Sequence, residues 1–292
     1  MTAALFGTGL LGGAIAQRLL SCGQALWIWN RSPDRGLPLR TLGAQQAATP
    51  LEAAERAQWL ITVLSDGPST RELLLEQIND GLLGRNVIQM GTIGPDESRD
   101  LAEAVTRRGG HYLEAPVLGS KPEALAGTLQ LMAGGSPELF EQALPLLRHL
   151  SAAPLHLGEV GSAMAAKLAL NQLIASLTHA FSLSLHLVQR SGVDVQAFMD
   201  VLRGSALYAP TFDKKLEREL KGDYGNPNFP TAHLRKDLAL FQAAARAADL
   251  DPQGLDGLLA LLQNATPAGL DPLDYCALHV LTAGHRAAAE QP

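Results

Sequence analysis

The chain has 292 residues, of which 47% are hydrophobic and 18% charged, so there is room for two domains with sizeable cores. Its formal net charge of −6 argues against nucleic acid as a partner, because nucleic-acid binding needs a basic face. The two cysteines, Cys22 and Cys276, form no CxxC pair, and the eight histidines form no HExxH pattern. We therefore expect neither a disulfide framework nor a bound metal.

Strand and helix patterns alternate up to about residue 160. The predicted strands are 3–6, 25–29, 59–64, 86–89, 111–114, 129–133 and 154–157. The predicted helices between them are 10–22, 51–56, 69–78, 95–108, 121–126 and 137–150. Such alternation is typical of an α/β domain with a doubly wound, mostly parallel sheet and helices on both faces.

The remainder of the chain shows no convincing strand, so we predict an all-α second domain and place the two domains at 1–160 and 161–292. The segment 162–190 contains neither Gly nor Pro and predicts one long helix, roughly 40 Å in length, that joins the domains. This helix is apolar on most sides, and such a helix must be buried on most sides. We therefore expect a second subunit to cover part of it.

The same apolar stretch is not expected to span a membrane, because 168–188 carries polar side chains such as Asn171, Gln172 and His179. Met1 leads directly into the first predicted strand, and no basic segment with an apolar stretch and cleavage site precedes it. We therefore expect a cytoplasmic protein with no membrane partner.

The segment Gly7-Thr8-Gly9-Leu10-Leu11-Gly12 stands between the first predicted strand and the first predicted helix. In this context a GxGxxG pattern indicates a dinucleotide site of the Rossmann type. Gly7 allows the tight turn, Gly9 lets the backbone approach the pyrophosphate, and Gly12 lets the helix pack closely. The pyrophosphate then meets the free N–H groups of the helix start, at Leu10 and Leu11.

The second predicted strand ends in Asn30-Arg31-Ser32. NAD-selective sites carry an Asp or Glu near this point, which binds the ribose 2′-hydroxyl. Here Asn30 takes that place, and we expect no carboxylate that would repel a 2′-phosphate. Arg31 can pair with this phosphate and stack on the adenine, and Ser32 can add a hydrogen bond. The pattern favours NADP(H) as the cofactor over NAD(H), with a solvated arginine as the alternative.

Lys167 and Asn171 lie four residues apart on the long predicted helix and therefore on one of its faces. Small residues surround the helix start, among them Gly161 and Ala163, and leave space for a ligand. A lysine on an apolar helix is costly unless its ammonium reaches water, a partner or a substrate. Either Lys167 extends to the surface or it faces the nicotinamide in the cleft between the domains; the glycine motif favours the second.

Four motifs, in order along essentially the whole chain, resemble those of the β-hydroxyacid dehydrogenases. The closest branch is that of the NADPH-dependent glyoxylate and succinic semialdehyde reductases, within the 3-hydroxyisobutyrate dehydrogenase-like proteins. The motifs are Gly7–Gly12 with Trp29–Ser32, Glu114–Lys121, Gly161–Asn171, and Phe229–Leu238. The resemblance implies a Rossmann domain joined by a long helix to an all-α domain, in a homodimer or homotetramer.

The resemblance also implies the site residues. Lys167 is the catalytic acid or base, and Asn171 binds the substrate or positions the lysine. The loop residues Leu118, Gly119 and Ser120 bind the substrate, whose carboxylate meets the Ser120 hydroxyl and the backbone N–H groups around Gly119. The further residues implied are Leu64, Ser65 and Thr92 lining the cofactor, Phe229 and Lys236 closing over the nicotinamide, and Asp237 beside them at the substrate.

Leu118 departs from the family pattern, in which a serine is usual. Either the carboxylate site is weaker than in the family, or the substrate is larger and less polar than glyoxylate. The implied reaction is reduction of a small aldehyde or keto acid to the hydroxy acid. Three alternatives stay open: a 3-hydroxyisobutyrate-type dehydrogenase that runs oxidatively, an imine reductase, and a dinucleotide-binding module without turnover. Lys167 counts against the imine reductase, since Asp or Tyr is common there, and it also counts against a module that has lost catalysis.

Overall fold

The computed structural model of the protein describes residues 2–284. The chain divides into two compact units, Met1–Leu168 and Ala169–Pro292. We predicted the domain boundary at 160/161, whereas the division between the compact units falls inside a helix. That helix is α8 (Ser162–Arg190), whose first turns pack into the core of the first unit through the fully buried Met164.

A sheet of nine strands forms the centre of the first unit, in the order β3-β2-β1-β4-β5-β6-β8-β7, with β9 beside β8. The strands are β1 (Thr2–Phe6), β2 (Ala25–Trp29), β3 (Gln45–Gln46), β4 (Trp59–Thr62), β5 (Asn86–Gln89), β6 (His111–Glu114), β7 (Val117–Leu118), β8 (Gln130–Gly134) and β9 (Leu155–Gly158). Strands β1 to β6 pair in parallel, and β8 runs antiparallel to β6 and β7. The predicted mostly parallel, doubly wound sheet is therefore confirmed, and its order reverses at β1 and β4, where dinucleotides bind in such folds.

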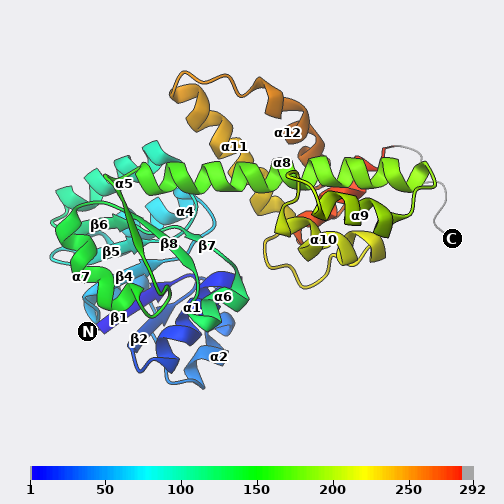
Figure 1. The fold of residues 1–292 in the computed structure, drawn as a ribbon. Coiled ribbons are helices and arrows are strands. Elements are labelled where there is room, and N and C mark those ends of the chain that lie inside the picture. The colour runs from blue at the N-terminus through cyan, green and yellow to red at the C-terminus, as the bar shows by residue number, and fades with distance from the viewer. Residues whose placement is uncertain (1, 285–292) are drawn as a thin grey trace. The chain divides into compact units, whose positions relative to one another are not determined.

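Helices cover both faces of this sheet (Figure 1). They are α1 (Leu10–Ser21), η1 (Pro33–Gly36), α2 (Leu37–Arg40), α3 (Pro50–Glu55), α4 (Gly67–Arg71), η2 (Glu72–Ile78), η3 (Asn79–Leu82), α5 (Pro95–Arg107), α6 (Lys121–Ala126) and α7 (Pro137–Leu147). On one face Leu5 and Ile28 pack with Ile15 and the residues of α6 and α7. On the other face Phe6 and Leu60 pack with α3, η2, α5 and the start of α8. Successive strand residues point to opposite faces, so each short apolar strand feeds two cores.

The predicted helix 69–78 is not a single α-helix. It begins earlier, as α4, and continues from Glu72 to Ile78 as a π-helix. Leu73, Leu74 and Leu75 are all buried there. The wider turn lets three consecutive leucines face the core, and a 3.6-residue pattern does not predict this.

Among its described residues the second unit contains helices and no named strand, as predicted. After α8 come α9 (Val195–Arg203), α10 (Pro210–Lys221), α11 (Thr231–Ala247), η4 (Gln253–Leu255), α12 (Asp256–Gln263), η5 (Tyr275–Ala277) and α13 (Leu278–Thr282). Asp274 is fully buried and binds Lys215 Nζ at 2.7 Å and the N–H of Asn228 at 3.2 Å. It therefore joins α10 to the loop that leads into α11.

Helix α8 keeps several apolar side chains exposed, among them Leu183 and Leu187, which are 51% and 68% accessible. By length and composition α8 is apolar enough to cross a membrane, with a mean hydropathy of 1.2, but a core helix of a soluble protein passes the same test.

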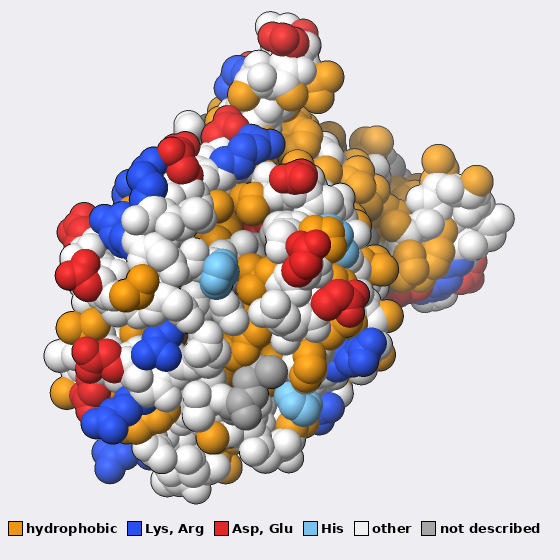
Figure 2. All heavy atoms as spheres, turned by 90° about the vertical axis from the view of Figure 1, so that its left-hand side faces the viewer, with side chains coloured by type: hydrophobic (Ala, Val, Ile, Leu, Met, Phe, Trp, Pro, Cys, Tyr) orange, Lys and Arg blue, Asp and Glu red, His pale blue; other side chains and the backbone are white. Residues whose placement is uncertain are grey.

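On the face seen in Figure 2, Lys and Arg side chains are interspersed with Asp and Glu. That face therefore offers no extended patch of one sign.

Candidate active site

The glycine turn after β1 has the geometry that the sequence predicts. Gly7 has φ +97°, and a Cβ there would lie 2.4 Å from the carbonyl oxygen of Val63. A Cβ on Gly12 would lie 1.9 Å from the carbonyl oxygen of Gly7. The steric roles predicted for Gly7 and Gly12 are therefore confirmed: one makes the turn and the other lets α1 pack against it.

Gly9 is different, because a Cβ at this position would have nothing within 4 Å. Gly9 is the N-cap of α1, and no side chain caps that helix. The buried hydroxyl of Thr8 has no hydrogen-bond partner among the described residues. An open approach to an uncapped helix start, beside an unpaired donor, fits a bound pyrophosphate. Leu10, which is half exposed, and Leu11 follow in the first turn of α1.

Asn30, at the end of β2, supports the glycine turn. Its Oδ1 accepts a hydrogen bond from the N–H of Thr8 at 2.9 Å, and its Nδ2 donates to the carbonyl of Ser32 at 3.0 Å. Both ends of the amide are therefore used within the protein, whereas the sequence suggested a direct contact with the ribose. Arg31 and Ser32 are exposed, and Arg31 makes no ion pair within the described part of the chain.

A hollow of about 690 Å³ lies beside this loop and is lined in part by Asn30, Arg40 and Asp34. Asp34 is a carboxylate in this lining, although the sequence predicts none that would repel a 2′-phosphate. It lies close to the position where a cofactor ribose is recognised, so both Arg31 and Asp34 bear on the choice between NADP(H) and NAD(H).

The loops after β4 and β5 meet beside the glycine turn. Leu64 reaches the space next to Gly7, and a Cβ on Gly91 would lie 2.5 Å from the carbonyl oxygen of Leu64. Only glycine fits there, so the two loops lie close together, and Thr92 is the next residue after this contact. Ser65 is exposed, and its hydroxyl donates to Asp66 at 2.7 Å. The structure therefore brings the predicted Leu64, Ser65 and Thr92 to the same sheet edge as Gly7.

In the loop after β7, Ser120 is hydrogen-bonded within the first turn of the helix that follows. Ser120 is the N-cap of α6, and both its N–H and its hydroxyl donate to Glu123, at 2.8 Å and 2.7 Å. The resemblance assigns this hydroxyl to a substrate carboxylate, which would compete with Glu123 for it. Gly119 is exposed with φ +125°, and Leu118 is half-buried next to it.

Lys167 and Asn171 are both buried, with 8% and 1% of their surface exposed, one turn apart on α8. Asn171 Nδ2 donates to Asp237 Oδ2 at 2.6 Å, and Asp237 Oδ1 lies 2.7 Å from Lys236 Nζ. Three predicted site residues of the second unit are therefore in one network. Phe229 lies in the loop before α11, with its ring 5.9 Å from that of Tyr275.

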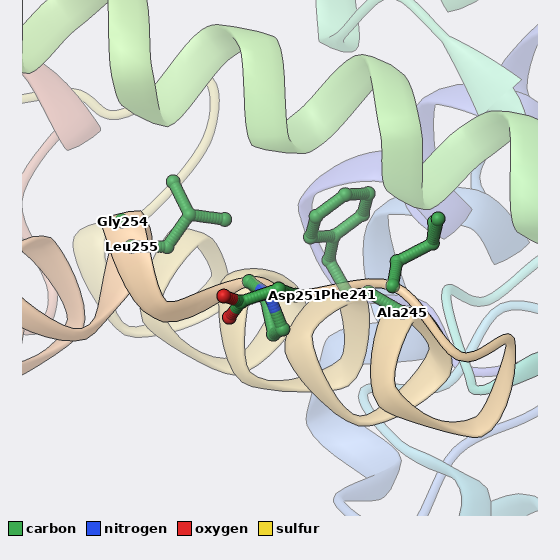
Figure 3. A pocket seen from close by; sticks show the side chains of 7 residues that line it. Phe241, Ala245, Asp251, Gly254 and Leu255 are labelled. Carbon is green, nitrogen blue, oxygen red and sulfur yellow. The ribbon is translucent and has the colours of Figure 1, made fainter.

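One hollow of the second unit contains none of these residues. It is a shallow groove of about 500 Å³, lined by Phe241, Ala245, Leu250, Asp251, Pro252, Gly254 and Leu255 (Figure 3). Phe241 and Leu255 point to the same side of the groove in that view. Asp251 is the one titratable residue in this lining, so the groove offers little chemistry.

Sequence analysis named Glu114 only as part of a loop motif, but the structure gives it a larger place. Its side chain is fully buried and accepts hydrogen bonds from the N–H groups of Ala163 and Met164, at the start of α8. Burial raises the pKa of Glu114, while the Ser98 hydroxyl and the N–H groups of α8 oppose the rise. A carboxylate at the end of an otherwise apolar strand was the signal that could have drawn attention to it.

The first unit has the features of a dinucleotide-binding domain: a parallel sheet, a glycine turn where the strand order reverses, and an uncapped helix start. The family models agree. Residues 2–161 match the NAD binding domain of 6-phosphogluconate dehydrogenase, and residues 161–281 match the NAD-binding domain of NADP-dependent 3-hydroxyisobutyrate dehydrogenase. The chain belongs to the β-hydroxyacid dehydrogenases, which are NAD(P)-dependent oxidoreductases acting on CH–OH groups.

Among curated proteins, glyoxylate/succinic semialdehyde reductase 1 of Arabidopsis thaliana is 31% identical over 284 residues, which cover 95% of this chain and 97% of that protein. Among solved structures, 3-hydroxyisobutyrate dehydrogenase of Mycobacterium tuberculosis with L-serine has a TM-score of 0.86 at 23% identity, covering 96% and 98% of the two chains. The imine reductase of Myxococcus stipitatus in complex with NADP+ has a TM-score of 0.66 at 22% identity, covering 96% and 99%. Both structures share the fold with this chain.

Proposed function

We propose that this protein is a cytoplasmic, NADPH-dependent reductase of a small aldehyde or keto acid, of the glyoxylate or succinic semialdehyde type, with Lys167 as the general acid. The observation that carries the proposal is the buried Lys167, one helical turn before the buried Asn171. Burial of an ammonium group is costly unless polar groups surround it, so a buried lysine marks a polar site within the protein. The Arabidopsis relative, which is named as a reductase of these aldehydes, supports the substrate class.

The first unit supplies the proposed cofactor site. Gly9 and the first turn of α1 receive the pyrophosphate, and Arg31 pairs with the 2′-phosphate. Leu64, Ser65 and Thr92 stand beside the nicotinamide half, and Phe229 and Lys236 of the second unit contribute to the same cofactor. When bound, NADPH supplies the hydride that reduces the carbonyl carbon.

Lys167 completes the proposed reaction at the carbonyl oxygen. As an ammonium ion it stabilises the negative charge that develops on this oxygen, and it then transfers one proton to it. The resulting neutral amine regains a proton from solvent before the next turnover. Asp237 fixes the Asn171 amide, because it accepts from Nδ2 at 2.6 Å, so the amide keeps one orientation towards the substrate.

The substrate is proposed to bind through its carboxylate at the N–H groups around Gly119 and at the Ser120 hydroxyl. Leu118 stands where the family usually has serine and makes this loop less polar. The first feature favours an aldehyde acid, and Leu118 favours one with an apolar part over glyoxylate itself.

The proposal is tested by following NADPH oxidation with glyoxylate, succinic semialdehyde, tartronate semialdehyde, apolar aldehydes and a cyclic imine. Faster turnover of an aldehyde acid than of the imine supports it. Three other results each overturn it in favour of one alternative. Turnover of the imine alone indicates an imine reductase. Oxidation of 3-hydroxyisobutyrate without carbonyl reduction indicates an oxidative dehydrogenase. Binding of NADPH without any turnover indicates a binding module.

A further inference from the structure

A row of buried polar side chains crosses the sheet of the first unit at the carboxyl end of its strands. Thr62, Gln89 and Glu114 are register partners on β4, β5 and β6, and each is fully buried. On each strand, the polar residue comes two positions after a core residue and therefore points to the same face of the sheet. These core residues are Leu60, Val87 and Tyr112. The three polar side chains therefore share the face that α5 and the start of α8 cover.

Glu114 is the charged member of this row, and its two oxygens hold two different helices. Oε1 accepts from the N–H of Ala163 at 2.8 Å and of Met164 at 3.2 Å, both in the first turn of α8. Oε2 accepts from the hydroxyl of Ser98 on α5 at 2.5 Å. Each of these three partners is a donor, which is the arrangement that a carboxylate needs.

The surrounding residues leave room for this carboxylate. A Cβ on Gly134 would lie 2.5 Å from Glu114 Oε1, so glycine is required on β8 next to it. The Ser98 hydroxyl also lies 2.9 Å from that of Tyr112. Several residues therefore form a specific site for this carboxylate. Burial of a charge is costly, and an apolar side chain would avoid that cost.

The turn that Glu114 holds is the one beneath Lys167. Lys167 follows Ala163 by four residues and Met164 by three, so all three lie on one side of α8. Helical side chains point back towards the N-terminus, which places the stem of Lys167 over the turn that contains Ala163 and Met164. A shift or rotation of this turn would therefore move the Lys167 ammonium.

We propose that Glu114 is a positioning residue for Lys167. It holds the first turn of α8 against β6 and thereby determines the position of the Lys167 ammonium group. The inference rests on the proposed function, since it assigns Glu114 a part in the reaction of Lys167. Glu114 is fully buried, so the proposal gives it no direct contact with substrate or cofactor.

The test compares Glu114→Asp with Glu114→Gln. Aspartate keeps the charge but is one methylene shorter, so it cannot hold Ser98 and the α8 turn together. Glutamine keeps the length, can accept from both N–H groups and can donate to Ser98 Oγ. We expect Glu114→Asp to lower kcat about tenfold or more, Glu114→Gln to stay within about threefold of the wild type, and KM for NADPH to stay within about twofold in both.

Glu97→Asp is the matched control, because Glu97 caps α5 by accepting from the N–H of Gly94 at 2.7 Å and holds its own helix rather than α8. It is expected to lower Tm without lowering kcat. Hydrogen exchange at the amides of Ala163 and Met164, which needs no activity, should be faster in Glu114→Asp than in the wild type. If Glu114→Asp does not fold, Ser98→Ala replaces it in the test. This variant removes only the hydroxyl group that donates to Glu114 Oε2, and it is expected to lower kcat about threefold.

Wild-type turnover with kcat unchanged in Glu114→Asp, while exchange at Ala163 and Met164 rises, would show a cap without a positioning role and overturn the inference. An equal loss of kcat in Glu97→Asp would overturn it as well, because the loss would then follow stability. Absence of carbonyl reduction by the wild type is a different result. It overturns the proposed function and, with it, any part of Glu114 in that reaction.

Discussion

At the scale of single residues, the choice of cofactor depends on the short exposed loop after β2. Arg31 has no ion pair within residues 2–284 and can meet a 2′-phosphate, whereas Asp34 lines the neighbouring hollow and would repel one. A hydrogen bond to a charged group contributes about 1.5–3 kcal/mol, whereas a fully exposed charge at some distance contributes much less. Arg31 is therefore expected to dominate.

Replacing Arg31 by alanine should lower the preference for NADPH over NADH, measured as the ratio of the two kcat/KM values, by about 10- to 100-fold. The effect should fall on KM for NADPH, because the phosphate is far from the reacting atoms. Arg35→Ala, in the same loop, is the control and should leave the ratio nearly unchanged. Equal losses with both cofactors in Arg31→Ala would contradict the role of Arg31.

Leu118 is expected to set the polarity of the substrate loop. Leu118→Ser restores a hydroxyl next to Gly119 and should raise kcat/KM for glyoxylate relative to a longer, less polar aldehyde acid by about tenfold, roughly the contribution of one hydrogen bond. Steady-state kinetics on the two substrates measure this ratio. An unchanged ratio would show that Leu118 does not select the substrate.

Some residue roles were predictable from the sequence and others were not. The jobs of Gly7 and Gly12 follow from the motif and its strand–turn–helix context. The capping box of Ser120 and Glu123 was not predicted, although a serine three residues before a glutamate is its signature. Asn30, however, binds the N–H of Thr8, 22 residues away, and Glu114 binds amides 49 and 50 residues away. A local pattern carries no information about such partners.

At the scale of helices, α10, α13 and α8 of the second unit bury a pair of titratable groups. His279 Nδ1 lies 3.5 Å from Glu219 Oε2, and the ring of His186 stacks on that of His279 with centroids 3.8 Å apart. Burial raises the pKa of Glu219 to about 8, although the Ser182 hydroxyl and Lys215 oppose the rise. Burial and the neighbouring His186 lower the pKa of His279 to about 4. The pair is therefore neutral, with its one proton on Glu219, rather than an ion pair.

This pair gives stability a defined dependence on pH. The ordinary pKa values are 4.5 for Glu219 and 6.5 for His279. The raised pKa of Glu219 stabilises the fold at low pH, and this contribution is lost as pH rises from 4.5 to 8. The lowered pKa of His279 stabilises the fold at high pH, and this contribution is lost as pH falls from 6.5 to 4. Between pH 4.5 and 6.5 the folded and unfolded pairs each hold one proton, so stability is level. Above pH 6.5 only the folded pair keeps its proton, and stability falls by about 1.4 kcal/mol per pH unit, until about pH 8.

Denaturant unfolding followed by circular dichroism at several pH values measures this slope. The three tryptophans, Trp27, Trp29 and Trp59, all lie in the first unit, so their fluorescence would not report on the pair. Glu219→Gln is the comparison, because it removes the proton that the folded pair keeps above pH 6.5. The variant should lose the extra decline between pH 6.5 and 8. The same decline in the variant and the wild type would contradict this account of the pair.

At the scale of the whole molecule, the exposed leucines of α8 favour an assembly of several copies. Leu183 and Leu187 are exposed on a helix that is apolar on most sides, and burial of such side chains contributes about 1.5–3 kcal/mol each. We propose a homodimer or homotetramer in which a second copy covers this part of α8. The reason is the free energy gained by burying apolar surface, rather than any single contact.

Analytical ultracentrifugation of the wild type and Leu187→Glu tests this. The wild type is expected to sediment as a dimer or tetramer, and Leu187→Glu to dissociate at concentrations at which the wild type does not. Leu155→Glu, at a leucine that is 58% exposed on β9 of the first unit, is the control and should not change the mass. A monomeric wild type would contradict the proposal.

The fold as a whole was more accessible to prediction than the site. The alternation of patterns predicted the sheet and the all-α half, because apolar periodicity directly reports which faces are buried. The two-residue strands β3 and β7 were missed, since two residues show no period. The π-helical stretch and the place of the division between the units also depend on packing against distant segments. The network of Asn171, Lys236 and Asp237 was predicted as a set of site residues, but its hydrogen bonds were not.

The central claim is that Lys167 donates the proton, and kcat of Lys167→Ala for the best aldehyde acid tests it most directly. Lys221→Ala, at an exposed lysine on α10, serves as the control, and NADPH binding is measured by fluorescence alongside. The account predicts that Lys167→Ala lowers kcat by about 10²–10⁴ while NADPH still binds, and that Lys221→Ala matches the wild type. A kcat of Lys167→Ala within a few-fold of the wild type would contradict the claim.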